Sequence, residues 1–151
     1  MFIRLHTDQV QRFWNLLVTM VENSVPPIAE GGMNRANKVC AEVYKGNADV
    51  WISAERKDGE VVTHAMVLTT ITWDRLSGVK NLLVYGVYSW GDPSGFLNAK
   101  WKEAVETLWK YGKKHGCNRI VAYTNDLKVL ERAKAFGGKE ICRLISFEIG
   151  E

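Results

Sequence analysis

The sequence opens with two segments in which apolar residues recur at three- and four-residue steps, the spacing of one helix face. The first begins at Thr7, a good N-cap, and ends before Pro26-Pro27, because proline lacks a backbone N–H and clashes with the preceding turn. The second begins after Asn34 and ends at Gly46, which suits the left-handed conformation that closes helices. The two apolar faces consist of Val10, Phe13, Trp14, Leu17, Val18 and Val21, and of Ala36, Val39, Cys40, Val43 and Tyr44.

Extended segments precede and follow these helices. Alternating residues predict a short strand over Phe2–Leu5. Further on, the β-rich runs Val50–Ala54 and Val61–Ile71 flank Asp58-Gly59, and an Asp-Gly pair in this setting predicts a hairpin with a type I′ turn. The apolar run Asn81–Ser89 predicts the next strand.

The last third of the chain predicts a helix from Asn98 to Lys114, a strand over Arg119–Thr124 and a second, shorter helix. After Gly137-Gly138 a final strand is expected over Glu140–Ile149. Antiparallel strands followed by a late helical crossover indicate a mixed α/β (α+β) fold with a mostly antiparallel sheet. Because neither repeats nor linker-like stretches appear, we expect residues 1–151 to form a single domain.

Composition narrows the functional classes. Of the 151 residues 46% are hydrophobic and 25% charged, which argues against disorder, and a net charge of +3 does not require a nucleic-acid partner. The three cysteines form no C-x-x-C pair, so we expect free thiols in a reducing compartment. The start lacks the apolar region of a signal peptide and no run is long enough to span a bilayer, so a cytoplasmic protein without a membrane partner is expected. No metal-ligand spacing appears.

The order of elements from the first strand to Ile149 resembles the GNAT N-acetyltransferase superfamily. The resemblance implies a sheet of six to seven strands flanked by four helices, in which strands four and five splay apart and acetyl-CoA lies between them. It also implies that backbone groups at the end of strand four hold the pantetheine, and that the following loop and helix start hold the pyrophosphate, as helix N-termini suit phosphates. The cofactor-binding residues would then be Val87, Tyr88, Ser89, Gly95, Phe96, Asn98, Ala99, Lys100 and Asn125.

Two positions depart from the family pattern. The phosphate loop of the family reads Q/R-x-x-G-x-G/A, whereas the matching window here is Phe96–Trp101, in which only Ala99 is small. The tyrosine that often serves as general acid is replaced by Ala133. Residues 91–95 also fit a plain surface turn, and Asn125 also fits a helix cap.

Catalysis needs a base to deprotonate the acceptor amine, and His64 is a candidate because imidazole titrates near neutrality. Tyr88 is a second candidate catalytic residue. By the period of two, Tyr85 and Tyr88 are expected on opposite faces of the sheet, so that only one faces the cleft.

Two functions follow from the resemblance. One is acetyl-CoA-dependent acetylation of an amine, either a small molecule or a peptide. The other is a catalytically inactive GNAT-fold protein that serves as a binding or assembly subunit, as in small phage-type relatives. A homodimer or an assembly partner is compatible with both, and no nucleic-acid partner is expected.

Overall fold

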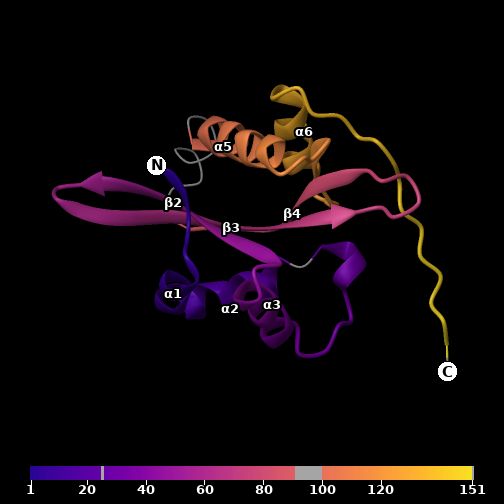
Figure 1. Ribbon diagram of the computed structural model, residues 1–151, viewed down its shortest axis with the longest axis horizontal. Coiled ribbons are helices and arrows are strands. Elements are labelled where there is room, and N and C mark those ends of the chain that lie inside the picture. The colour runs from indigo at the N-terminus through magenta and orange to yellow at the C-terminus, as the bar shows by residue number, and fades with distance from the viewer. Residues whose placement is uncertain (25, 91–99, 151) are drawn as a thin grey trace.

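The computed structural model describes residues 1–24, 26–90 and 100–150. Its centre is a single mixed sheet of five strands in the order β1-β2-β3-β4-β5 (Figure 1). Neighbouring strands are antiparallel from β1 to β4, and β5 is parallel to β4. The strands are β1 (Phe2–Arg4), β2 (Ala48–Lys57), β3 (Glu60–Trp73), β4 (Lys80–Ser89) and β5 (Arg119–Ala122).

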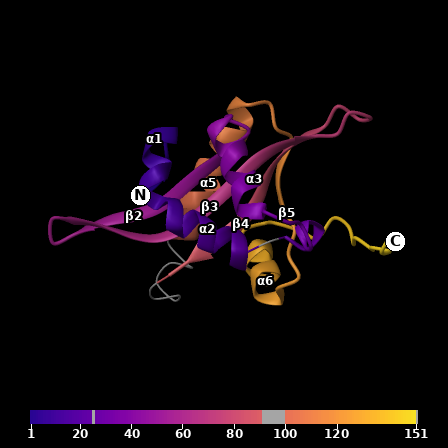
Figure 2. The ribbon, with the colours of Figure 1, turned by 90° about the horizontal axis from the view of Figure 1, so that it is seen from below.

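Helices cover both faces of the sheet, and Figures 1 and 2 show α1, α2 and α3 on one face with α5 and α6 on the other. The first expected helix forms as three adjoining pieces, so the described part of the chain contains the four helical segments that were predicted. None of its helices is long and apolar enough to cross a membrane. The segments are α1 (Thr7–Val10), η1 (Gln11–Phe13), α2 (Trp14–Asn23), η2 (Pro27–Ala29), α3 (Arg35–Tyr44), α5 (Trp101–Lys114) and α6 (Leu127–Ala135).

Two hydrophobic cores lie on opposite sides of the sheet, as the alternation of strand side chains requires. The core beneath α2 and α3 includes Leu17, Met20, Ile52, Met66 and Leu68. The core beneath α5 includes Phe2, Trp51, Val67, Leu82, Ala104 and Leu108. The mixed α/β class expected from the order of elements is therefore confirmed.

The hairpin between β2 and β3 confirms the predicted turn. Asp58 and Gly59 both have positive φ angles, 53° and 82°, as a type I′ turn requires. Lys57 consequently pairs with Glu60, and the register continues regularly to Ala54 opposite Thr63.

Two β-bulges interrupt the sheet near the end of β4. On β3, His64 is the extra residue, because Ala54 pairs with Thr63 and Ser53 pairs with Ala65. On β4, Tyr85 is the extra residue, because Leu68 pairs with Gly86 and Thr69 pairs with Val84. Bulges bend a strand and redirect its side chains, and they are common beside active sites.

The expected final strand over Glu140–Ile149 does not form. No backbone hydrogen bond joins residues 139–150 to another described residue, and all of these side chains are exposed. The sheet therefore has five strands in the described residues rather than six to seven. The reason is that an alternating sequence gives a segment the ability to pair, whereas a strand exists only where a partner strand satisfies its backbone groups.

Candidate active site

The candidate site is the place where β4 and β5 part. Their parallel pairing begins at Asn81 opposite Arg119 and ends at Val84 opposite Ala122. The bulge at Tyr85 follows immediately, and β4 continues to Ser89 without a partner on its β5 side among the described residues. The prediction that these two strands are parallel neighbours and lose contact at their C-terminal ends is confirmed.

Backbone amides on this open side are directed toward the space that β5 leaves. Trp90 N donates to His64 O at 2.9 Å, just beyond the Ala65–Ser89 pair. In an antiparallel ladder this bond makes Ala65–Ser89 a non-hydrogen-bonded pair. Such pairs alternate with hydrogen-bonded pairs along the two strands. Val67–Val87 is the next such pair, so Val87 and Ser89 point their N–H and C=O groups away from β3.

The end of α2 lies against the same stretch of β4. The Ser24 hydroxyl donates to the Val87 carbonyl at 3.0 Å. Gly86 approaches so closely that a Cβ atom there would lie 3.3 Å from the Ser24 carbonyl oxygen. Ser24 caps the C-terminus of α2 just before Pro26-Pro27, so the loop after α2 begins beside the bulge in β4. Sequence reasoning did not single out Ser24.

His64, a predicted catalytic residue, belongs to a cluster with Glu55 and Lys100. Glu55 Oε1 lies 2.9 Å from His64 Nε2, a close contact whose direction does not satisfy a hydrogen bond, and Glu55 Oε2 lies 2.9 Å from Lys100 Nζ. Lys100 stands immediately before α5, so the cluster joins the start of that helix to β2 and β3. The lysine holds the pKa of Glu55 below its usual range.

Sequence reasoning did not single out Glu55. The type I′ turn places Glu55 opposite Val62. Because residues two apart on a strand share a face, His64 is the diagonal neighbour of Glu55 on the same side of the sheet, so the hairpin register could have indicated this pair. A consequence is that Lys100, expected to carry positive charge for a phosphate, already has an ionic partner.

Tyr88 and Tyr85 do not lie on opposite faces, so that prediction is wrong. Both pack against the core beneath α2 and α3, together with Trp90, whose ring centroid lies 5.9 Å from that of Tyr88. The extra residue at Tyr85 shifts the alternation by one, which brings residues three positions apart to the same face. Tyr88 therefore lies on the face that α2 covers.

Asn125 follows β5 in the connection to α6. The interpretation of Asn125 as a helix cap is wrong, because the cap of α6 is Asp126, whose Oδ1 accepts from Lys128 N at 2.8 Å. The exposed Asn125 is therefore not required for capping. The predicted cofactor residues Gly95, Phe96, Asn98 and Ala99 lie outside the described residues.

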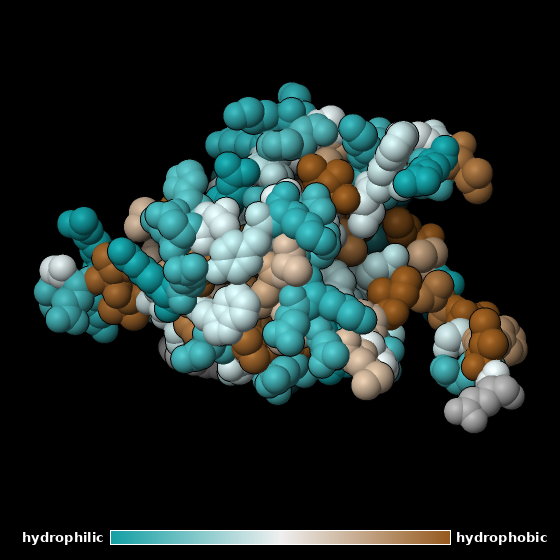
Figure 3. Space-filling model, turned by 60° about the horizontal axis from the view of Figure 1, so that its bottom comes forward, coloured by the Kyte–Doolittle hydropathy of each residue, from teal (hydrophilic) through white to brown (hydrophobic). Residues whose placement is uncertain are grey.

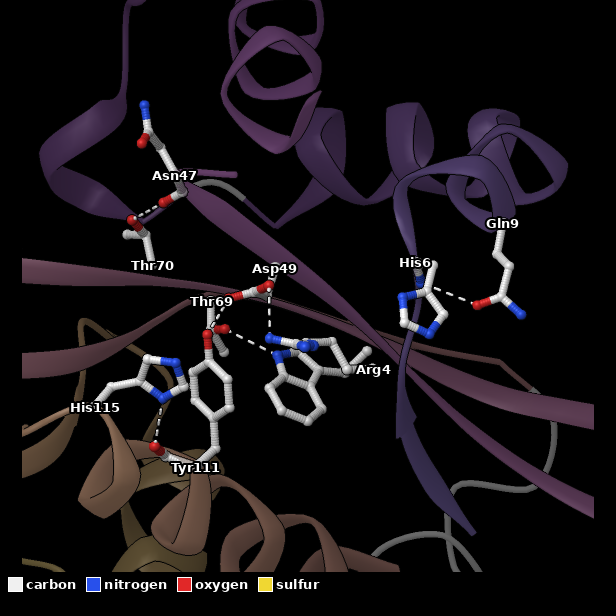
Figure 4. Close-up of polar contacts among 10 residues, drawn as sticks. Arg4, His6, Gln9, Asn47, Asp49, Thr69, Thr70, Tyr111 and His115 are labelled. Carbon is white, nitrogen blue, oxygen red and sulfur yellow. Dashed lines mark hydrogen bonds and ion pairs between the residues drawn. The ribbon is translucent and has the colours of Figure 1, made fainter. Parts of the chain in front are cut away.

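A second polar cluster lies near the start of β2, on the β1 side of the sheet (Figure 4). Tyr111 Oη donates to Asp49 Oδ2 at 2.6 Å, and Arg4 Nη1 lies 3.6 Å from Asp49 Oδ1. Burial and the Asp49 hydrogen bond raise the pKa of Tyr111 to about 12. An open cavity of about 480 Å³ borders these residues. Because the carboxylate, phenol and guanidinium satisfy one another, we interpret the cluster as a structural tie between β1, β2 and α5.

Comparisons with known proteins bear on the fold of the chain. No protein-family model and no curated protein sequence matches the chain. Among solved structures, an aminoglycoside N-acetyltransferase, AAC(6')-Iy in complex with CoA, has a TM-score of 0.65 at 15% identity and covers 99% of both chains. A predicted acetyltransferase with acetyl-CoA from Clostridium acetobutylicum has a TM-score of 0.67 at 10% identity, covering 98% of this chain and 95% of its own.

Glucosamine-6-phosphate N-acetyltransferase from Arabidopsis thaliana has a TM-score of 0.62 at 16% identity, covering 99% of this chain and 98% of its own. At such low identities the likeness concerns the fold. It extends along nearly the whole chain, which includes β4 and β5. The chain has the fold of the GNAT acetyltransferases, as the order of its elements predicts.

Proposed function

We propose that the protein binds acetyl-CoA between the ends of β4 and β5 and transfers the acetyl group to an amine. The observation that carries the proposal is the pair of outward-directed backbone groups at Val87 and Ser89, placed where β5 has left the sheet. Such amides can hydrogen-bond a pantetheine chain or a developing oxyanion. Structures of the same fold that contain CoA or acetyl-CoA support this choice of co-substrate.

Each step of the proposed acetyl transfer is assigned to particular residues. The amine nitrogen attacks the thioester carbonyl, forming a C–N bond while the C–S bond breaks and CoA leaves as a thiolate. His64 is the proposed base for the amine proton, and Glu55 beside its Nε2 would stabilise the protonated imidazole. The end of α2 and the loop after Ser24 would border the acceptor, because they lie against β4 at Val87.

The leaving thiolate needs a proton, and the family's usual donor is not present in this sequence. The position at which the resemblance expects tyrosine is Ala133, which has no ionisable group. This absence supports a second candidate function, a protein that binds acetyl-CoA or a partner without catalysing transfer. Tyr88 and the exposed Tyr123 are the alternative donors near the two strand ends.

Calorimetric titration with acetyl-CoA tests the binding site. Replacing Ser89 by proline removes the outward N–H without removing a bond to β3. Because one hydrogen bond contributes about 0.5–1.5 kcal/mol, we expect Ser89→Pro to weaken binding by roughly two- to tenfold. Ser89→Ala is the matched control, since it removes the hydroxyl and keeps the N–H, and it should bind like the wild type. Equal affinity of all three proteins, or no binding by the wild type, would refute the site.

A further inference from the structure

The cavity beside Tyr111 is bordered by elements that are far apart in the sequence. Its volume of about 480 Å³ lies within the range of sites for small molecules. Its lining is mostly polar, whereas Figure 3 shows hydrophobic side chains along residues 139–150. A mostly polar lining favours a charged or hydrogen-bonding ligand. The ionisable residues that line it are Arg4 at the end of β1, His6 before α1, Asp49 at the start of β2, Tyr111 in the last turn of α5 and His115 after that helix.

The cavity is separate from the proposed acetyl-CoA cleft. Lys100, immediately before α5, belongs to the cluster with Glu55 and His64 beside the cleft. His115, immediately after α5, lines the cavity. The helix between them has 14 residues and therefore spans about 21 Å. An inference about the cavity consequently does not depend on acetyl transfer.

The lining carries more basic than acidic side chains. The basic ones are Arg4, His6 and His115, and Asp49 is the one acidic side chain among the described residues that line the cavity. Both oxygens of Asp49 are engaged, because Oδ2 accepts from Tyr111 and Oδ1 faces Arg4. At the end of α3, Lys45 and Glu42 pair with each other at 3.2 Å. An anionic ligand would therefore meet an excess of basic groups.

Arg4 can donate to a ligand while it remains beside Asp49. Its Nη1 lies 3.6 Å from Asp49 Oδ1, an ionic contact that is too long for a hydrogen bond. Its guanidinium carbon lies 5.4 Å from the centroid of the Tyr111 ring, whose face attracts a cation. A guanidinium has five N–H donors, so these contacts hold Arg4 in place without using all of them.

His115 offers its second ring nitrogen to the cavity. Its Nδ1 lies 2.9 Å from the Tyr111 carbonyl oxygen, and because a carbonyl only accepts, we assign a proton to Nδ1. Nε2 is then the nitrogen left for a ligand, and it becomes a donor when the ring is protonated. The position after the C-terminus of α5 favours that positive charge. Figure 4 shows the Tyr111 ring between His115 and Arg4.

The charge of the cavity changes with pH through its histidines. Imidazole titrates near neutrality, so His6 and His115 gain charge as the pH falls from about 8 to about 6. Arg4 and Asp49 keep their charges, since guanidinium and carboxyl groups titrate outside this range. Burial raises the pKa of Tyr111 to about 12, so its phenol stays neutral. The cavity is therefore most cationic at the acidic end of the range.

We propose that this cavity is a second ligand site, which binds a small molecule through two anionic groups, phosphate or carboxylate, with Arg4 and His115 as the anchors. Both anchors donate hydrogen bonds from a positive charge, which is the strong kind for such groups. The hydrogen bond from Tyr111 to Asp49 fixes the ring between the anchors, so the site is formed before the ligand arrives. Affinity rises as His115 is protonated, because Nε2 then donates to the ligand.

Proton NMR of the histidine rings tests the site, because the chain has three histidines. The probes are succinate, with two carboxylates, and inorganic pyrophosphate, with two phosphate groups, each added at constant ionic strength. We expect a saturable shift of the His115 ring resonances, and the probe that binds more tightly identifies the kind of anionic group. Succinate should leave His64 unmoved. It should also bind more tightly at about pH 6 than at about pH 8, although its own charge does not fall over that range.

Variants separate a built site from a diffuse basic surface. Arg4→Gln removes one anchor and should weaken binding of the tighter probe roughly tenfold or more. Lys114→Gln is the matched control, since it removes an equal charge from an exposed residue that does not line the cavity, and it should bind like the wild type. His115→Gln, observed at the His6 ring, removes the other anchor and decides the matter if Arg4→Gln does not fold.

Three results would overturn the proposal. One is the absence of a saturable His115 shift with both probes. Another is a His64 shift with the same succinate affinity as the His115 shift, which would indicate a general ionic effect. The third is an equal loss of affinity in Lys114→Gln and in the anchor variants, which would indicate a diffuse basic surface.

Discussion

The carboxylate of Glu55 lies 2.9 Å from both His64 Nε2 and Lys100 Nζ. Its pKa therefore determines the pH range in which this cluster stays intact. Because Lys100 lowers the pKa of Glu55, the folded state binds a proton there less readily than the unfolded chain does. The contribution of Glu55 to stability is therefore present above the ordinary pKa of a glutamate, about 4.3. It is lost as the pH falls through the lower pKa of the folded state. Near neutrality the cluster stays intact, and Lys100 remains engaged with the carboxylate.

Ala133 leads to the first prediction about catalysis. Without a nearby acid the thiolate must take its proton from water or from a more distant group, and general acid catalysis typically contributes about a hundredfold to ten-thousandfold. We expect wild-type acetylation of small amines or peptides to fall well below the roughly 1–1000 per second of ordinary enzymes. Ala133→Tyr should raise the rate, as measured by chromatography of the acetylated product.

The matched control for this change is Ala133→Phe, which has the bulk of tyrosine without its hydroxyl and should not raise the rate. Turnover by the wild type at ordinary enzyme rates would contradict the prediction of slow acetylation. It would indicate that Tyr88 or Tyr123 acts as the acid. Equal rates for the tyrosine and phenylalanine variants would show that position 133 does not deliver a proton.

At the scale of elements, the bulge in β4 is the feature that makes the site. It ends the pairing with β5, turns Val87 and Ser89 outward and brings Gly86 against the end of α2. The approach is close enough that a methyl group at Gly86 would need the Ser24 carbonyl to move. Since Ser24 is held to Val87 by its hydroxyl, that movement would also disturb the outward-directed backbone of the site.

We therefore expect Gly86→Ala to destabilise the protein by about 1–3 kcal/mol, the usual cost of overpacking. The matched control is Gly112→Ala in α5, where the new Cβ would meet its neighbours at 3.5 Å or more, an ordinary contact. Alanine is favoured over glycine in helices by about 0.5–1 kcal/mol, so this variant should be neutral or more stable. Urea unfolding measures both, and equal midpoints for the two variants would rule out the tight approach at Gly86.

Elements with a regular period could be predicted from the sequence, whereas departures from the period could not. The helices, the hairpin turn and the parallel β4–β5 pair follow from apolar spacing, the Asp58-Gly59 pair and the crossover. The bulge at Tyr85 inserts one residue without a sequence signal, and it places Tyr85 and Tyr88 on one face where regular alternation predicted opposite faces. The segment after Gly138 was assigned to the sheet because its pattern suits a strand, but no strand in the described part of the chain pairs with it.

The whole molecule has one well-packed end and one incomplete end. Strands β1 to β4 are sandwiched between two cores, while β5, α6 and the segment Lys139–Gly150 carry exposed apolar side chains. These elements contribute little burial, so they should open at a low free-energy cost.

This difference in packing gives the last prediction. In native-state hydrogen exchange we expect the amides of Lys139–Gly150 to exchange without protection, because none of them donates a backbone hydrogen bond within the described residues. The amides in the paired stretches of β2 and β3 should exchange only through global unfolding, because both strands lie between the two cores. Protection of the Lys139–Gly150 amides comparable to that of β2 and β3 would contradict the prediction and would show that a strand pairs with this segment.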